Sequence, residues 1–430
     1  MTPGARVAAA IEVLDDIEAR RRPAADALKD WGLSHRFAGS KDRSAIGTLV
    51  FDALRRRASS AFIMGVETPR AIMLGAMRQV RGMSVDEIAA LCTGQAHAPS
   101  TLTEAESERL ASADLAGAPV HVAGDFPEWL EPSFIAVFGE AAVAEASALA
   151  ARAPLDLRVN TLKGTRDKAL ASLAHLQPQP TPLSPLGLRL PLTSDGRGPA
   201  LAAEPAYVKG LVEIQDEASQ LAALLAAAKP GEQALDLCAG AGGKTLALAA
   251  LMQNKGQIYA TDSDGRRLMP IYARLERAGA RNVQVRPQRR GGEGLSDLEG
   301  RCDLVLVDAP CTGTGAWRRN PDAKWRVRPG ALDQRIADQD QALVEAARFV
   351  KPRGRILYVT CSVLREENED RLAAFLAAHP EFKSLPARDM AEQAELPGLV
   401  AFASRFGEGL RLTPLTSETD GFFIAMLVRS

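Results

Sequence analysis

Hydrophobic and polar positions follow three different patterns along the chain. From residue 1 to 140, apolar residues recur every three or four positions, as at Ala8, Ile11, Leu14 and Ile17, and β-branched runs are scarce. Residues at this spacing lie on one face of an α-helix. The pattern predicts a helical domain over 1–140.

A mixed pattern covers residues 148–222. A strand-like stretch at Leu155–Val159 precedes a helical pattern after Gly164, and a proline-rich loop over residues 178–185 separates these from further short strands. Apolar runs bounded by glycine and proline indicate short strands and turns. We expect a small α/β domain over 148–222.

From residue 223 to the C-terminus, short apolar strands alternate with helical patterns. Five strands are predicted, at residues 234–238, 257–261, 282–286, 304–307 and 355–360. Alternation of this kind is typical of βαβ units, in which helices cover both faces of a parallel sheet. The fold class predicted for 223–430 is therefore α/β, with a doubly wound, Rossmann-like sheet.

Composition and charge limit the partners and the cellular compartment that we expect. The 430 residues carry a formal net charge of -1, so a polyanionic partner must be met by local basic patches. The 5 cysteines are scattered and odd in number, which indicates free thiols in a reducing compartment and no disulfide framework. Acidic residues such as Asp15 and Asp16 in the first helical pattern argue against a signal or transit peptide, and no apolar run approaches the roughly 20 residues that span a bilayer. We expect a cytoplasmic protein that needs no membrane, and a monomer.

A glycine-rich turn follows the first strand of the predicted sheet. It reads Cys238-Ala239-Gly240-Ala241-Gly242-Gly243-Lys244, and a helical pattern comes directly after it. Glycines let the backbone approach a ligand, and the helix N-terminus offers unpaired N–H groups. A phosphate-binding loop is excluded, because Cys238 stands where that loop needs glycine. A tight turn that uses glycine only for its geometry remains the alternative.

An acidic residue ends the next strand. Asp262 lies about twenty residues beyond the glycines, where a carboxylate can accept hydrogen bonds from ribose hydroxyls. Asp264 is the rival candidate, although it could instead cap the following helix. This arrangement fits a dinucleotide or S-adenosylmethionine.

Two cysteines distinguish these cofactors. Asp308-Ala309-Pro310-Cys311 follows the strand at 304–307, and Cys361 follows the strand at 355–360. Hydride transfer has no need of two thiols at strand ends, whereas covalent activation of a substrate ring does. S-adenosylmethionine is therefore the expected cofactor. No motif surrounds Cys92 or Cys302, so both are interpreted as core residues.

Taken together, the motifs resemble those of the Sun family of RNA cytosine-5 methyltransferases, in particular the bacterial RsmB-like subgroup with a NusB-like, RNA-binding N-terminal domain. The matching stretches are Cys238–Lys244, Asp308–Gly315, Thr360-Cys361-Ser362, Thr419-Asp420-Gly421-Phe422-Phe423, Arg158-Val159-Asn160-Thr161 and, more weakly, Gly39-Ser40-Lys41-Asp42-Arg43. The resemblance covers the C-terminal half strongly.

The resemblance implies roles for individual residues. Cys361 is expected to add to C6 of the cytosine, so that C5 can attack the methyl group, while Asp308 bonds the Watson–Crick edge near N3. Cys311 is expected to assist the elimination that frees the RNA. Lys244 takes a direct part in the site or is only a first-turn helix residue. No metal is implied.

The resemblance also implies the residues that bind S-adenosylmethionine. They are Cys238, Ala239, Gly240, Ala241, Gly242, Gly243, Lys244, Asp262, Gln288 and Asp308. The family usually has proline at the position of Ala241 and an aspartate near residue 288. Gln288 could accept the adenine hydrogen bond in place of that aspartate.

RNA contact is expected directly after the Cys311 loop. Residues 317–328 contain five cations and two tryptophans against the single acid Asp322, a composition that can pair with phosphates and stack on unpaired bases. The alternative is a solvated surface with the tryptophans in the core. The expected substrate is small-subunit ribosomal RNA, and the alternatives are a transfer RNA methyltransferase, a non-catalytic RNA-binding or ribosome assembly factor, and a dinucleotide oxidoreductase.

Overall fold

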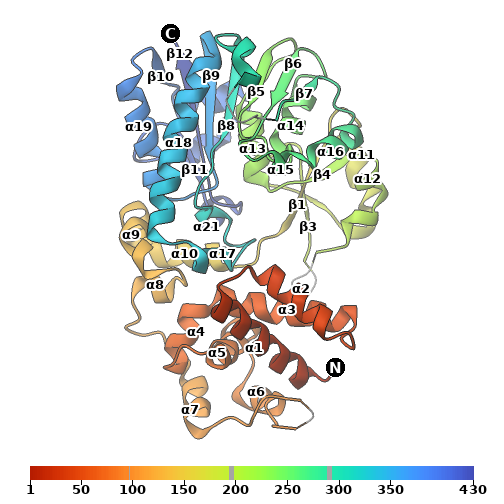
Figure 1. Cartoon of the computed structure of the whole chain (residues 1–430), viewed down its shortest axis with the longest axis vertical. Coiled ribbons are helices and arrows are strands. Elements are labelled where there is room, and N and C mark those ends of the chain that lie inside the picture. The colour runs from red at the N-terminus through yellow and green to blue at the C-terminus, as the bar shows by residue number, and fades with distance from the viewer. Residues whose placement is uncertain (96, 193–197, 288–292) are drawn as a thin grey trace. The chain divides into compact units, whose positions relative to one another are not determined.

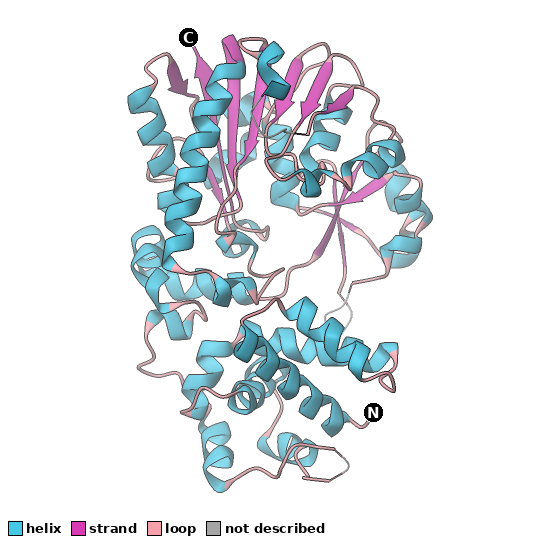
Figure 2. Ribbon diagram, in the orientation of Figure 1, coloured by secondary structure: helices cyan, strands magenta, loops and turns pink. Residues whose placement is uncertain are grey.

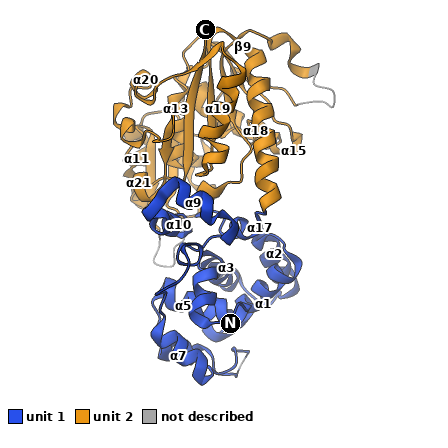
Figure 3. Ribbon diagram, turned by 90° about the vertical axis from the view of Figure 1, so that its left-hand side faces the viewer, with its two compact units in different colours: residues 1–152, 317–328 blue, residues 153–316, 329–430 orange. Residues whose placement is uncertain are grey.

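The computed structural model describes residues 1–95, 97–192, 198–287 and 293–430. It separates two compact units (Figure 3). Unit 1 comprises residues 1–152 and 317–328, and unit 2 comprises residues 153–316 and 329–430. The three domain boundaries expected from the sequence are not tested by this division and stay predictions.

Unit 1 is helical, as its apolar spacing predicted (Figure 2). Its helices are α1 (Pro3–Arg20), α2 (Ala24–Ser34), α3 (Ser40–Arg55), α4 (Arg57–Met64), α5 (Pro69–Arg81), α6 (Val85–Leu91), α7 (Glu104–Ser112), α8 (Val120–Ala123), α9 (Glu131–Phe138), α10 (Ala142–Ala150) and α17 (Ala323–Arg326). The Thr2 side chain caps α1 by accepting from the Ala5 amide, and a proline follows it at the first helical position. Val13, Ile46 and Leu74 meet in the core of the unit.

The stretch Glu128–Ala150 is long and apolar enough to cross a membrane by length and composition, which corrects the expectation that no such run exists. In the structure it breaks into η1 (Glu128–Leu130), α9, η2 (Gly139–Ala141) and α10. The break falls at Gly139, whose φ of 58° is left-handed. Phe134 is fully buried and stacks on Phe126, with ring centroids 4.4 Å apart. The segment thus contributes apolar side chains to the interior of unit 1.

Residues 317–328 belong to unit 1, although they follow the Cys311 loop in sequence. Trp317 is 2% exposed and stacks on Phe134. Lys324 is fully buried, and its Nζ donates to the carbonyls of Arg55 and Asp125 at 2.9 and 2.6 Å. We predicted that residues 317–328 form an exposed basic patch that binds RNA. This prediction is wrong for Trp317, Arg318 and Lys324, because all three side chains are buried.

Replacing Lys324 by methionine is expected to destabilise the protein by about 1–3 kcal/mol, because two buried carbonyls lose their donor. Burial lowers the pKa of Lys324 to about 7, so methionine recovers part of the cost of burying the ammonium group. Denaturant unfolding measures the change. Arg328→Met, at an exposed position of the same segment, is the control and should leave stability unchanged. Equal stability of the Lys324→Met protein and the parent would contradict this account of the segment.

Unit 2 contains a small antiparallel sheet in the order β2-β3-β1-β4. Its strands are β1 (Leu155–Val159), β2 (Gln179–Pro180), β3 (Gly187–Leu190) and β4 (Val212–Ile214), accompanied by α11 (Arg166–Ser172) and α12 (Pro205–Val208). Leu157 and Val159 of β1 enter an apolar cluster. The alternate residues Asp156 and Arg158 are buried too, and their polar groups bond other parts of unit 2.

The large sheet of unit 2 has the order β10-β12-β9-β8-β5-β6-β7 (Figure 1). The five predicted strands are confirmed as β5 (Gln233–Asp236), β6 (Gln257–Ala260), β7 (Val283–Val285), β8 (Cys302–Asp308) and β9 (Val350–Thr360), all parallel. β12 (Phe422–Arg429) runs antiparallel between β9 and β10 (Phe382–Ser384), and β11 (Leu410–Leu412) pairs with it.

Helices cover both faces of the large sheet, which confirms the doubly wound α/β fold. The helices of this part of the chain are α13 (Glu217–Leu225), α14 (Gly243–Leu251), α15 (Gly265–Leu268), α16 (Ile271–Ala278), α18 (Pro329–Phe349), α19 (Glu369–Ala378), α20 (Ala387–Gln393) and α21 (Pro414–Ser417). Leu304 and Leu306 of β8 pack in one apolar cluster, while Val305 and Val307 pack in another. Strand order reverses at β5, so ligands are expected outside the carboxyl ends of β5 and β8.

Candidate active site

The glycine turn lies between the end of β5 and the start of α14. Gly240 and Gly242 have left-handed φ values of 51° and 84°. A Cβ on Gly242 would lie 2.4 Å from Cγ1 of Ile271, so no other residue fits there without a shift. The turn therefore needs glycine both for its conformation and for close packing against α16.

Two arginines outside the motif bond the carbonyls of this turn. Arg158 donates to the Gly243 carbonyl at 2.7 Å, and Arg274 donates to the Ala241 carbonyl at 2.7 Å. Arg158 is buried, which lowers its pKa to about 10. The sequence offered a signal only for Arg158, which lies in the matched Arg-Val-Asn-Thr stretch. These bonds fix the turn in front of the first helical N–H groups of α14.

Asp236, the last residue of β5, is a site residue that sequence reasoning missed. Its Oδ2 accepts from the Thr245 hydroxyl at 2.6 Å, and burial raises its pKa to about 7. Within the described residues, the buried Oδ1 has no hydrogen-bond partner. The signal was an acid at the strand end, four residues before Gly240. A buried acceptor beside a left-handed glycine turn is a suitable neighbour for a positively charged or hydrogen-bonding ligand.

Asp262 lies against the glycine turn. It is 1% exposed, accepts from the Gly240 amide at 3.0 Å and pairs with Arg267 at 3.3 Å. Asp264 instead caps α15 by accepting from the Arg266 amide, as its alternative reading predicted. Gln288, the residue expected at the adenine, lies outside the described residues.

Asp262→Ala is expected to weaken S-adenosylmethionine binding by at least about tenfold, or 1.4 kcal/mol, because it removes an acceptor and releases the Gly240 amide. Isothermal titration calorimetry with the cofactor measures the change. Asp264→Ala is the matched control and should keep the parental affinity. A larger loss in Asp264→Ala than in Asp262→Ala would reverse the assignment.

The two predicted thiols meet at the carboxyl ends of neighbouring strands. Sγ of Cys311, after β8, lies 3.3 Å from Sγ of Cys361, after β9. The hydrogen bond with Cys361 and burial raise the pKa of Cys311 well above its usual value. Cys311 therefore holds its proton more firmly than a free thiol does.

Asp308 and Lys244 form an ion pair at the same edge of the sheet. Their Oδ2 and Nζ atoms are 2.6 Å apart, and Nζ lies 5.3 Å from the ring centroid of Phe422. The Lys244 side chain is 8% exposed, whereas that of Asp308 is 34% exposed. Lys244 therefore does more than begin a helix: it holds the Asp308 carboxylate. Its direct part in the chemistry stays a prediction.

Glu367 fixes the loop that carries Cys311, although no sequence motif pointed to this residue. Its buried carboxylate accepts from the Thr312 amide at 2.8 Å and from Gln339 at 3.0 Å. Gln339 also donates to the Pro310 carbonyl at 2.9 Å. The thiol is thus held by backbone contacts on both sides.

The structure brings together the glycine turn, Asp262, Asp308 and both thiols, while Cys92 and Cys302 lie in apolar cores. Among the residues that the structure describes, no group of three or more histidine, cysteine, aspartate or glutamate side chains could hold a metal ion. The left-handed glycines and the unpartnered Asp236 oxygen fit a nucleoside cofactor with a charged tail.

Comparison with known proteins connects this site to a family. The family model described as 16S rRNA methyltransferase RsmB/F matches residues 222–428, and a ferredoxin-like domain of RsmF/B-like methyltransferases matches residues 126–195. A probable ribosomal RNA small subunit methyltransferase B of Synechocystis is 32% identical over 308 residues, which cover 71% of this chain and 67% of the relative. The methyltransferase B of Sodalis glossinidius is 34% identical, covering 70% and 65%. The chain thus spans about two thirds of the length of these relatives.

Solved structures share the architecture. The crystal structure of PH0851 has a TM-score of 0.73 and 25% identity and covers 99% of both chains. A methyltransferase homolog protein from Pyrococcus horikoshii has a TM-score of 0.59 and 27% identity, covering 72% of this chain and 98% of its own. The chain belongs to the RsmB/F family of 16S rRNA methyltransferases, and S-adenosylmethionine is the cofactor that its site fits.

Proposed function

We propose that this protein transfers a methyl group from S-adenosylmethionine to C5 of a cytosine in small-subunit ribosomal RNA, through a covalent bond between Cys361 and C6. The observation that carries the proposal is the contact of the two thiols, 3.3 Å apart, beside Asp308 and the glycine turn. The names of the relatives support ribosomal RNA as the substrate.

The cofactor would be held by the glycine turn and the adjacent strand end. The backbone of residues 238–243 and the N-terminus of α14 would meet its charged tail, and Asp262 would accept from its ribose. When bound, it supplies an electrophilic methyl group on a sulfonium. Gln288 as the adenine contact remains part of the proposal.

Cys361 would activate the cytosine ring. C5 is a poor nucleophile, and a thiolate that adds to C6 turns the ring into an enamine-like species that can attack a methyl group. The hydrogen bond with Cys361 and burial raise the pKa of Cys311, so Cys311 would keep its proton while Cys361 acts as the nucleophile. Asp308, held by Lys244, would bond the Watson–Crick edge near N3 as charge develops.

Cys311 would release the product. After methyl transfer, C5 carries both a methyl group and a proton, and C6 is still bonded to Cys361. A water molecule would take the C5 proton, the C5–H electrons would form the C5=C6 double bond, and the C6–S bond would break so that Cys361 leaves as a thiolate. Cys311, whose sulfur lies 3.3 Å from that of Cys361 in the free protein, would assist by giving its proton to the departing sulfur. The target base must be unpaired or flipped out to reach the thiols.

Methyl transfer to ribosomal RNA tests the proposal. With labelled S-adenosylmethionine, 16S rRNA from cells that lack the gene should gain about one methyl group per molecule. Bisulfite sequencing should place it at one cytosine, and transfer RNA from the same cells should gain none. Labelling of transfer RNA alone would favour the transfer RNA alternative, and no labelling of either RNA would favour a non-catalytic assembly factor.

The proposed compartment is the cytoplasm, and the protein is proposed to act as a monomer.

A further inference from the structure

The turn formed by Thr419, Asp420 and Gly421 precedes β12 and has no assigned role. The Gly421 amide donates to the Gly315 carbonyl at 2.8 Å, and the Gly315 amide donates to the Cys361 carbonyl at 2.9 Å. Two hydrogen bonds therefore connect the turn with the end of the Cys311 loop and then with Cys361.

The contact between the two glycines leaves no space for a side chain. A Cβ on Gly315 would lie 2.0 Å from the Gly421 carbonyl oxygen, and a Cβ on Gly421 would lie 2.6 Å from Cα of Gly315 and 2.7 Å from Cγ1 of Val363. Since backbone atoms are in contact on both sides, any side chain here must move the loops apart. The turn therefore contacts both loops that carry the thiols, through Gly315 and Val363.

Phe422, the residue after the turn, lies beside the ion pair of Lys244 and Asp308. The ring of Phe422 lies 5.3 Å from Nζ of Lys244, which bonds Asp308. A displacement of the turn would therefore change the positions of both the thiol pair and the Asp308 carboxylate.

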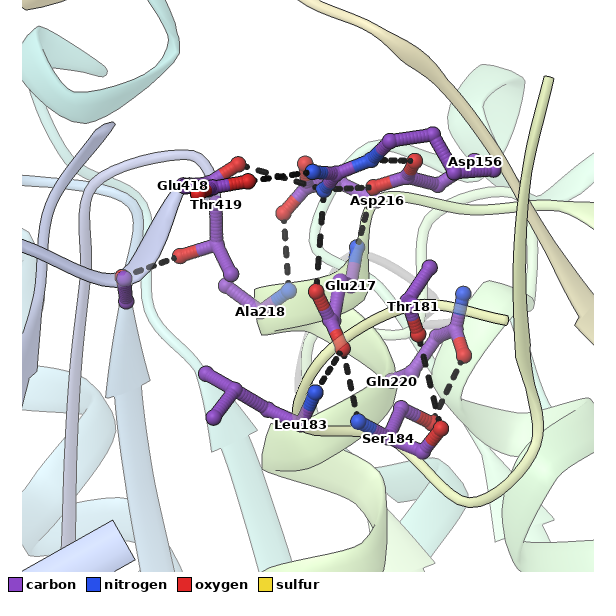
Figure 4. A network of polar contacts seen from close by, with 12 residues as sticks. Asp156, Thr181, Leu183, Ser184, Asp216, Glu217, Ala218, Gln220, Glu418 and Thr419 are labelled. Atoms are coloured by element: carbon purple, nitrogen blue, oxygen red, sulfur yellow. Dashed lines mark hydrogen bonds and ion pairs between the residues drawn. The ribbon is translucent and has the colours of Figure 1, made fainter. Parts of the chain in front are cut away.

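Half-buried polar groups of other elements also hold the turn (Figure 4). The Asp216 carboxylate accepts from the Asp420 amide at 3.2 and 3.3 Å and also from the Ala218 amide at 2.8 Å, which caps α13. Arg189 of β3 donates to the carbonyl of Glu418 at 3.2 Å. The same guanidinium group forms a bidentate pair with Asp156 at 2.8 and 3.1 Å. The turn is therefore anchored on the small antiparallel sheet and on the start of α13.

We propose that the Thr419–Gly421 turn is a positioning element of the methyl-transfer site, and that Gly421 and Asp216 are positioning residues. Gly421 sets the distance between the Cys311 loop and Cys361, and Asp216 fixes the turn that carries Gly421. The inference rests on the proposed function for its effect on rate, but the spacing of the thiols is a property that can be measured without any reaction.

Phenylarsine oxide reports this spacing. It condenses with two neighbouring thiols, forming two As–S bonds and releasing one water, and it needs both sulfurs within reach. One equivalent should bind tightly to the parent protein, and Cys311→Ala or Cys361→Ala should abolish tight binding. Cys92 and Cys302 are buried in apolar cores.

Gly421→Ala is the decisive variant. It should weaken phenylarsine oxide binding by about tenfold or more and lower kcat by about 10- to 100-fold, because catalytic groups misplaced by about 1 Å lose activity on that scale. The S-adenosylmethionine affinity should fall less than kcat does, because the glycine turn is not touched. Gly398→Ala is the matched control, since nothing lies within 4 Å of its added Cβ, and it should change neither quantity.

Asp216→Ala gives a second test, should Gly421→Ala fail to fold. It should weaken arsenical binding and kcat in the same direction, and Asp216→Asn should restore both, because asparagine keeps an acceptor for the Asp420 amide. Thr165→Ala removes the cap of α11 but touches no part of the turn, so it controls for the loss of a helix cap.

Two results would overturn the inference. One is a folded Gly421→Ala or Asp216→Ala protein with parental arsenical binding, whatever its rate. The other is an equal effect of Thr165→Ala, which would reduce Asp216 to a helix cap. If instead the parent protein binds the arsenical, the variants do not, and no RNA is methylated, the spacing role stands and the proposed function fails.

Discussion

Cys311→Ala protein is expected to remain joined to methylated RNA, whereas Cys361→Ala protein forms no such complex. The two sulfurs lie 3.3 Å apart, yet the proposed steps use them in succession. Without Cys361 the ring is never activated, so methyl transfer should fall by at least about 1,000-fold, or 4 kcal/mol of transition-state stabilisation. Without Cys311 the bond forms and the methyl group transfers, but elimination stalls.

Denaturing gels with labelled RNA and labelled cofactor separate these outcomes. A retarded band that carries both labels is expected for Cys311→Ala only. Cys302→Ala removes a buried thiol of β8 outside the site and should behave like the parent. A trapped band in Cys361→Ala instead would exchange the two roles, and methylation without an adduct in either variant would remove covalent catalysis from the proposal.

The second large effect is expected at Asp308. Asp308→Ala should lower the single-turnover rate by about 100- to 10,000-fold, the range for loss of a group that hydrogen-bonds the reacting ring. Lys244→Met should give a smaller loss of about 10- to 100-fold, because the carboxylate remains but is no longer held at 2.6 Å by Nζ.

Rapid mixing of preformed enzyme–RNA complex with labelled cofactor gives these rates, and calorimetry gives the cofactor affinity separately. A rate unchanged in Lys244→Met would return Lys244 to the role of a first-turn helix residue. A loss in Asp308→Ala that is explained entirely by cofactor affinity would assign Asp308 to binding alone.

Sequence patterns located the large sheet because its signal is local. The apolar runs of β8 and β9 are nearly continuous, as expected for strands covered on both faces, and the parallel order then brings Cys311 and Cys361 to one edge. The glycine turn could be predicted for the same reason. The left-handed φ at Gly240 and Gly242 favours glycine, and glycine is visible in the sequence.

Features that depend on distant partners could not be read in this way. The cations of residues 317–328 indicated an exposed surface, but Lys324 is satisfied by carbonyls 199 and 269 positions away. Glu367 and Arg274 likewise gain their roles from backbone groups of other elements. From the sequence alone, a charged residue is predicted to be exposed to solvent, because its buried hydrogen-bond partners are known only from the fold.

The placement of residues 317–328 in unit 1 has a consequence for how the chain folds as it is synthesised. Residues 1–152 leave the ribosome early, but the indole that stacks on Phe134 and the ammonium group that bonds the carbonyls of Arg55 and Asp125 arrive only with residues 317–328. Domains usually fold in order of synthesis. Here the N-terminal unit stays incomplete until strands β5 to β8 of the large sheet have been synthesised, and a fragment that ends at residue 152 would lack these contacts permanently.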